Sequence, residues 1–142
     1  MRYYPDALQV RFDRSQLFTE MALYQSAIED LRMLTTASPK TAEFVNALAW
    51  LLATCPDARF HNGNEALSIA LKAVSIDRNA QYLDTLAAAQ ARRGDFKQAV
   101  ETQQAVLDML TKEKAAPETI EECSARLGLY KAGKAYIQKR SK

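Results

Sequence analysis

Glycine and proline are scarce in this sequence, with only four of each among 142 residues. These two residue types supply most of the tight turns that join β-strands, so their scarcity argues against a β-rich fold. The chain is instead 48% hydrophobic, and alanine, leucine and glutamine are prominent among its helix-forming residues. The composition therefore indicates an all-α protein of the size of one domain.

Cysteine and histidine are also rare, since the chain has two cysteines, Cys55 and Cys123, and one histidine, His61. Two cysteines are too few for a disulfide framework, so both are expected to be free thiols. A metal site needs three or four converging ligands, and His61 has only Cys55 and Asp57 near it in sequence. We expect no metal site, a loop histidine in contact with water, and in Cys55 a poor nucleophile at the negative end of a helix dipole.

Motifs of catalysis are missing as well. The sequence contains no glycine-rich phosphate loop and no serine in a nucleophile elbow. Adjacent carboxylates such as Glu121 and Glu122 point about 100° apart on a helix, so they cannot flank one substrate. We therefore expect a protein that is not an enzyme and that has no cofactor.

The sequence also lacks a long apolar run and a strong excess of charge of one sign. No stretch of about twenty apolar residues could span a bilayer, and the first ten residues lack the apolar core of a signal peptide. The formal net charge of +2 is too small to indicate a nucleic-acid partner. We predict a cytoplasmic chain without a membrane span; a removed leader or a larger parent chain is the alternative. Basic residues from Lys134 to Lys142 are expected to form a frayed end.

Helical periodicity dominates the sequence between short breaks. Asn62 and Asp95 stand where side chains can cap the helices that follow them, and Gly94 is placed to end the preceding helix in a left-handed turn. Phe96 is expected to pack across that turn. The predicted helices span residues 6–21, 24–36, 41–54, 63–76, 80–92, 96–112 and 117–132.

A repeat is visible when the predicted helices are aligned in pairs. Ala27, Ala66 and Ala99 occupy equivalent positions in three second helices, and Ala49 and Ala87 do so in two first helices. A small residue where helices cross lets their backbones approach closely, and a large residue beside it fills the remaining groove. The recurrence predicts one shared packing surface across successive helical hairpins.

The repeat resembles the tetratricopeptide repeat family, whose unit is a pair of antiparallel helices of about 34 residues. The motif's spacing is best matched between residues 80 and 110, by Leu83, Leu86, Ala87, Gly94, Phe96 and Ala99. An earlier match to the second helix of the motif is made by Tyr24, Ala27, Leu31, Leu34 and Pro39. The helix before it has Arg11 and Arg14 where the family has large apolar residues. The middle repeat resembles a bacterial variant in which extra residues lengthen the turn between its two helices.

The resemblance implies an all-α fold, a right-handed superhelix (α-solenoid) of about three helical hairpins with a C-terminal capping helix. The chain would form a single domain, with repeats at about 8–39, 42–79 and 80–113, the capping helix at 117–132 and a basic tail at 133–142. In such a superhelix, the first helix of each pair lines a concave groove. The groove residues that the resemblance implies are Phe12, Gln16, Glu43, Asn46, Trp50, Gln81, Asp84 and Arg92.

The function expected from the resemblance is non-enzymatic binding of a peptide or partner protein in this groove. One subgroup of the family clamps a terminal carboxylate with lysines and asparagines, but Glu43 and Asp84 stand at the corresponding surface here, so a polar or basic segment is expected instead. Trp50 either anchors that segment or packs beneath the loop at 55–64. The alternatives are a scaffold or self-assembly unit whose copies stack end to end, and nucleic-acid binding through the basic tail.

Overall fold

The computed structural model describes residues 5–140, and within that range the chain is all-α, as predicted. Each predicted helix boundary lies within one residue of the observed boundary. Because this agreement extends to both ends of every helix, the periodicity of the sequence is sufficient to place them. The elements are α1 (Pro5–Glu20), α2 (Tyr24–Ala37), α3 (Ala42–Thr54), a short 3-10 helix η1 (Ala58–Phe60), α4 (Gly63–Ile76), α5 (Ala80–Arg93), α6 (Phe96–Lys112) and α7 (Pro117–Lys131).

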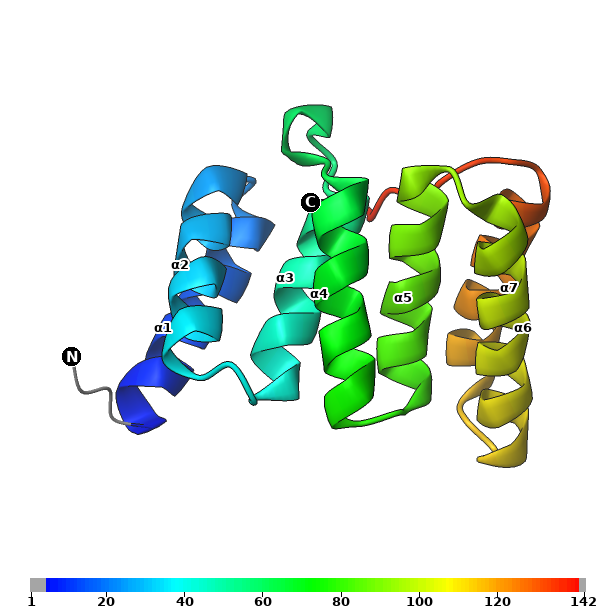
Figure 1. Cartoon of the computed structure of the whole chain (residues 1–142), viewed down its shortest axis with the longest axis horizontal. Coiled ribbons are helices and arrows are strands. Elements are labelled where there is room, and N and C mark those ends of the chain that lie inside the picture. The colour runs from blue at the N-terminus through cyan, green and yellow to red at the C-terminus, as the bar shows by residue number, and fades with distance from the viewer. Residues whose placement is uncertain (1–4, 141–142) are drawn as a thin grey trace.

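Consecutive helices pack against each other along the whole chain, so the helices stand side by side in a row from α1 and α2 to α6 and α7 (Figure 1). Helices α3 and α5, which are not consecutive, also pack directly against each other. Helix α4 connects these two helices and contacts both of them. The pair α3 and α5 therefore provides a continuous surface in the middle of the molecule.

The aligned alanines lie in the core, as predicted. Ala27, Ala66 and Ala99 are completely buried, and so are Ala49 and Ala87. Their small side chains allow close approach between neighbouring helices, while buried leucine, valine and aromatic side chains fill the space around them. The helical row is thus held together mainly by apolar packing.

Helix α1 is attached in a different way, which explains its two unexpected arginines. Arg11 donates to the carboxylate of Asp30 on α2 at 3.2 Å, and Arg14 donates to both oxygens of the same carboxylate at 2.6 and 2.9 Å. Asp30 itself is buried. A charged cluster therefore replaces the apolar contact expected at these positions, and packing of Phe12 on Phe44 of α3 supplements it.

The turn between α5 and α6 shows one prediction confirmed and another wrong. Gly94 has a φ of 94°, its N–H donates to Ala91 O, and the N–H of Asp95 donates to Gln90 O, the pattern of a Schellman motif. Phe96 packs on the apolar cluster beside the turn. The Asp95 side chain does not cap α6: it accepts no hydrogen bond from the first turn, and its Oδ2 lies 3.5 Å from Nε of Arg93 instead.

The other predicted cap is present. The side chain of Asn62 accepts a hydrogen bond from the backbone N–H of Glu65 at 3.1 Å. Directly after it, Gly63 lies against the last turn of α5, where an added Cβ would come within 2.9 Å of the backbone nitrogen of Arg93. The start of α4 is therefore fixed both by a cap and by a close backbone contact that only glycine permits.

The expectation of a frayed basic tail is wrong for residues 132–140, here called the C-terminal segment. This segment leaves α7 and returns across the molecule to the end of α3 (Figure 1), where the backbone N–H of Gln138 donates to Thr54 O at 2.8 Å. The expected tail also included Lys142, which lies outside the described residues. Backbone hydrogen bonding, which net charge does not reveal, holds the segment in place.

Two non-glycine residues adopt the left-handed conformation at helix ends, Ala22 with a φ of 60° and Lys114 with a φ of 57°. Since this conformation is costly for residues with a Cβ, Ala22→Gly should raise the free energy of unfolding by about 0.5–1 kcal/mol. The matched control is Ala125→Gly at an exposed position within α7, which should lower it by about 1 kcal/mol. Urea denaturation measures both changes, and a loss of stability in both variants would contradict the prediction.

Candidate functional site

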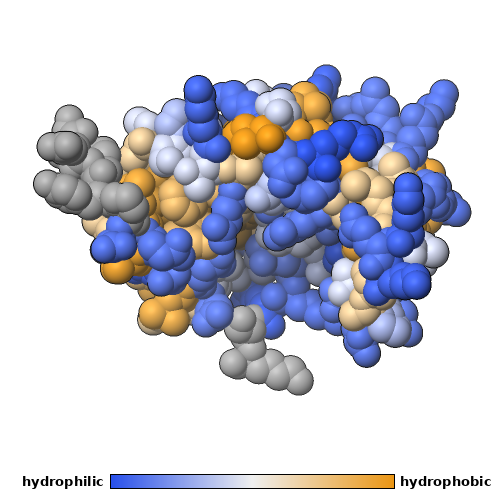
Figure 2. Space-filling model, turned by 90° about the horizontal axis from the view of Figure 1, so that it is seen from below, coloured by the Kyte–Doolittle hydropathy of each residue, from blue (hydrophilic) through white to orange (hydrophobic). Residues whose placement is uncertain are grey.

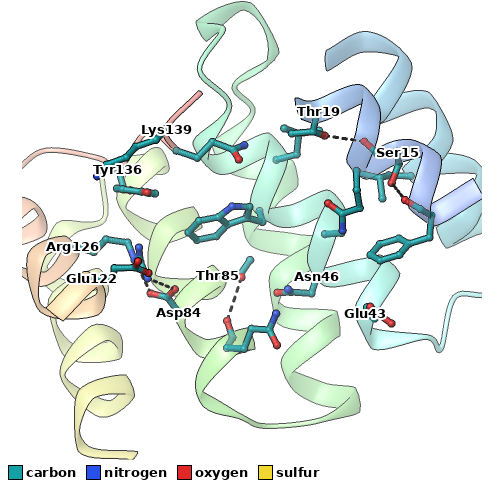
Figure 3. Close-up of a pocket in the computed structure, with 18 residues that line it drawn as sticks. Ser15, Thr19, Glu43, Asn46, Asp84, Thr85, Glu122, Arg126, Tyr136 and Lys139 are labelled. Carbon is teal, nitrogen blue, oxygen red and sulfur yellow. Dashed lines mark hydrogen bonds and ion pairs between the residues drawn. The ribbon is translucent and has the colours of Figure 1, made fainter. Parts of the chain in front are cut away.

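A hollow of about 520 Å³ lies over the surface made by α3 and α5. Helix α1 borders it on one side, and α7 with the C-terminal segment borders it on the other (Figure 3). Seen from below in Figure 2, hydrophilic residues cover the middle of the molecule, between the lobes formed by the two ends of the row. The residues that line this central hollow are Phe12, Ser15, Gln16, Thr19, Leu31, Glu43, Asn46, Ala47, Trp50, Leu51, Gln81, Asp84, Thr85, Glu122, Arg126, Tyr136, Gln138 and Lys139.

Seven of the eight residues predicted to face a groove line the central hollow. They are brought together because they recur every three or four positions, which places them on one face of each helix. This spacing is clearest on α3, which contributes Glu43, Asn46 and Trp50. The seven are Phe12, Gln16, Glu43, Asn46, Trp50, Gln81 and Asp84.

The eighth residue, Arg92, does not line the hollow. Its Nε donates to Ala53 O at 2.7 Å, and its NH2 group donates to Tyr136 O at 3.1 Å. Burial lowers the pKa of this guanidinium. Arg92 is drawn to the carbonyl groups at the negative end of α3, so it joins α5 to α3 and to the C-terminal segment.

The sequence interpretation missed the wall formed by α7 and the C-terminal segment. Glu122 and Arg126 reach the hollow from α7, while Tyr136, Gln138 and Lys139 reach it from the segment that follows. These residues were assigned to a cap and a solvated tail. The only signal available was the helical spacing of Glu122 and Arg126, which does not reveal the helix that they face.

The centre of this wall is an ion pair between Asp84 and Arg126. The guanidinium donates to both carboxylate oxygens, at 3.1 Å from Nε and 2.9 Å from the NH2 group, and only 13% and 10% of the two side chains are exposed. Gln103 donates to the same carboxylate at 2.9 Å and to Cys123 O at 3.0 Å. Burial alone would lower the pKa of Arg126, but the neighbouring Asp84 carboxylate raises it. Arg126 therefore stays positively charged.

Two aromatic rings lie against this ion pair. The guanidinium carbon of Arg126 is 5.0 Å from the ring centre of Tyr136 and 5.6 Å from that of Trp50, within the range of cation–π attraction. The two rings are 5.7 Å apart. Trp50 therefore faces the hollow and contacts the C-terminal segment.

The loop between α3 and α4 packs elsewhere, so the alternative of Trp50 beneath this loop is wrong. Phe60 of the loop contacts Tyr24 of α2, with ring centres 6.3 Å apart. His61 is hydrogen-bonded through Nε2 to Cys55 O at 2.6 Å, so it holds the loop in shape and is not simply hydrated as expected. The loop is thus closed on itself and on α2, away from the hollow.

Groups able to bind metals or act as nucleophiles do not gather at the hollow. Within residues 5–140, no three or more His, Cys, Asp or Glu side chains are grouped to hold a metal ion. Both cysteines are buried and free, and burial raises the pKa of each thiol, with Asp84 raising that of Cys123 further. The thiols consequently stay protonated near neutral pH. What the hollow offers is hydrogen bonding, charge and aromatic surface.

Two comparisons of the sequence with known proteins identify no relative. No protein-family model matches the sequence, and the search of curated proteins finds no significant match. Among the described helices, none combines the length and apolarity needed to cross a membrane. Inferences about function therefore depend on the geometry of the hollow.

The importance of the buried ion pair can be measured by removing one partner. Asp84→Ala leaves the buried Arg126 charge without its counter-ion, so the free energy of unfolding should fall by about 3 kcal/mol. Glu65→Ala is the control, since it breaks an ion pair with Arg32 in which the side chains are 33% and 47% exposed, and it should cost less than about 1 kcal/mol. If urea denaturation shows the same loss of unfolding free energy in both variants, the Asp84–Arg126 pair stabilises the fold no more than the exposed pair does.

Proposed function

We propose that the chain is a non-enzymatic binding module of the tetratricopeptide type, which holds an extended polar or basic peptide in the central hollow. The observation that carries this proposal is the lining itself, in which mostly polar side chains from five helices and the C-terminal segment surround a single open space, with the rings of Trp50 and Tyr136 paired at one wall. Hydrogen-bonding groups around an aromatic anchor are typical of peptide-binding surfaces. The packing of α3 on α5 supports a superhelical arrangement, because first helices of successive repeats are neighbours in that architecture.

The charges in the hollow favour a basic partner. Asp84 is neutralised by Arg126, whereas neither Glu43 nor Glu122 has an ion-pair partner within residues 5–140. Figure 3 shows Glu122 beside Arg126 on one side and Glu43 toward α1 on the other. A lysine or arginine side chain lying across the hollow would find a free carboxylate near either side.

Selection from a phage-displayed library of random peptides, with the full chain as bait, tests this function. Enriched peptides should contain an aromatic residue and basic residues, and Trp50→Ala should weaken their binding at least about tenfold in fluorescence anisotropy. Glu43→Lys should weaken binding as well. Glu29→Lys makes the same charge change on α2 outside the hollow and should leave the affinity unchanged.

Circular dichroism checks that the helical content of each variant is intact. Peptides that bind the Trp50→Ala and Glu43→Lys variants as tightly as the original chain would place binding outside the hollow. A selection that enriches no peptide would contradict the proposed function altogether.

A second candidate function is self-assembly through the N-terminal end of the row. Val10 and Leu17 on α1, and Met21 directly after it, are 67%, 54% and 59% exposed, although they are large apolar residues. The lobe beside the grey N-terminal residues in Figure 2 carries several hydrophobic residues. Repeat proteins commonly cover such an end, and a second copy of this chain could do so by pairing α1 with α1.

Analytical ultracentrifugation at increasing protein concentration tests self-assembly. The average mass should rise with concentration, and Leu17→Glu should abolish the rise by placing a charge within the contact. Leu71→Glu is the control, because Leu71 is similarly exposed, at 51%, but lies on α4. A constant monomer mass at every concentration would leave peptide binding as the only candidate.

A further inference from the structure

The C-terminal segment is itself an extended peptide bound at the edge of the central hollow. After Gly133 it has no regular secondary structure, and it is held by a few identifiable contacts. Gln138 N–H donates to Thr54 O at the end of α3, and Tyr136 O accepts from Arg92 on α5. Main-chain hydrogen bonds combined with one anchored side chain are also how proteins hold extended peptides from other molecules.

The anchored side chain is Tyr136. Its ring lies against the Arg126 guanidinium and the Trp50 ring, while Arg92 holds its carbonyl oxygen. We call the site formed by Trp50, Arg92 and Arg126 the Tyr136 subsite. Ile137, the next residue, is 50% exposed, whereas Tyr136 and its neighbour Ala135 pack against the apolar cluster that contains Tyr130.

The chemistry of the segment matches that of the peptide expected in the hollow. An aromatic residue is followed by basic residues, Lys139 and Arg140, and Lys139 lines the hollow whose free carboxylates are Glu43 and Glu122. Figure 3 shows Tyr136 and Lys139 at the rim, on the same side as Arg126. Residues 136–140 therefore have the same chemistry, an aromatic residue followed by basic residues, as the peptide proposed to bind in the hollow.

Few backbone hydrogen bonds oppose the release of this segment. Between residues 134 and 140, only Lys134 and Gln138 donate backbone hydrogen bonds to other residues of the described chain. Ordering an extended stretch costs conformational entropy at every residue, and segments with few buried contacts open at the low end of the stability scale. A competing peptide could thus replace the segment without unfolding the helices.

We propose that residues 134–140 are a built-in ligand of the Tyr136 subsite, and that an external partner binds by displacing them. The partner is an extended peptide in which an aromatic residue precedes a basic one. This inference rests on the proposed function, since it names the ligand class and the regulation of the same hollow. Because a tethered segment has an effective concentration in the millimolar range, it weakens every competing peptide of moderate affinity.

Fluorescence titration with a synthetic peptide of residues 132–142 tests the displacement. Trp50 is the only tryptophan of the chain, so its emission reports directly on the subsite. In the full chain, Tyr136→Ala and Gln138→Pro each remove one contact of the built-in ligand, and both variants should bind the peptide at least about tenfold more tightly than the original chain. Ile137→Ala is the control and should change nothing, since that side chain is half exposed.

A peptide in which the tyrosine is replaced by alanine should fail to bind any of these chains. The proposal is overturned if both loosened variants bind the peptide no better than the original chain, or if the alanine peptide binds equally well. Gln138→Pro and Tyr136→Ala remove different contacts. If circular dichroism shows that one variant does not fold, peptide binding by the other variant decides the test.

The outcome is separable from that of the proposed function. Library peptides that bind the hollow of the original chain and of the loosened variants equally, without improved binding of the 132–142 peptide, would support peptide binding and overturn displacement. Binding of the 132–142 peptide to the loosened variants, with no library peptide enriched, would show that residues 134–140 are a built-in ligand and would overturn the binding of external partners.

Discussion

The ion pair between Asp84 and Arg126 is the interaction on which the site depends. It joins α5 to α7 with little solvent around either charge, so neither side chain can stay in place without the other. The same guanidinium lies against Trp50 and Tyr136, which ties α3 and the C-terminal segment to the pair. One buried contact thus aligns three helices and an extended segment, and it defines a wall of the central hollow.

The floor of the hollow depends on a second constraint, the direct packing of α3 against α5. Ala49 on α3 and Ala87 on α5 are completely buried, and α3 and α5 pack against each other directly. Close packing of this kind resists deformation, so polar side chains on the opposite face of each helix keep fixed positions. The polar side chains of α3 and α5 that line the hollow thus share one supported face.

Contacts at the helix ends join the C-terminal segment to the helical row. Arg92 uses its charge to satisfy carbonyl groups of α3 and of the segment, and Gln138 satisfies another carbonyl at the same helix end. These contacts are few and lie at the rim, whereas the helices share an extensive apolar core. The local stability of the C-terminal segment is therefore expected to be lower than that of the helices.

The sequence by itself determined the helices, the buried alanines and most of the hollow's floor, because each of these follows from residues a few positions apart. The spacing of Glu43, Asn46 and Trp50 is sufficient to place them on one face of α3. Only the tertiary structure decided that Arg126 faces Asp84, that Arg92 turns away from the hollow and that Tyr136 lies on Trp50. Those contacts join residues 42, 39 and more than eighty positions apart, and they depend on how whole helices pack, for which no local pattern exists.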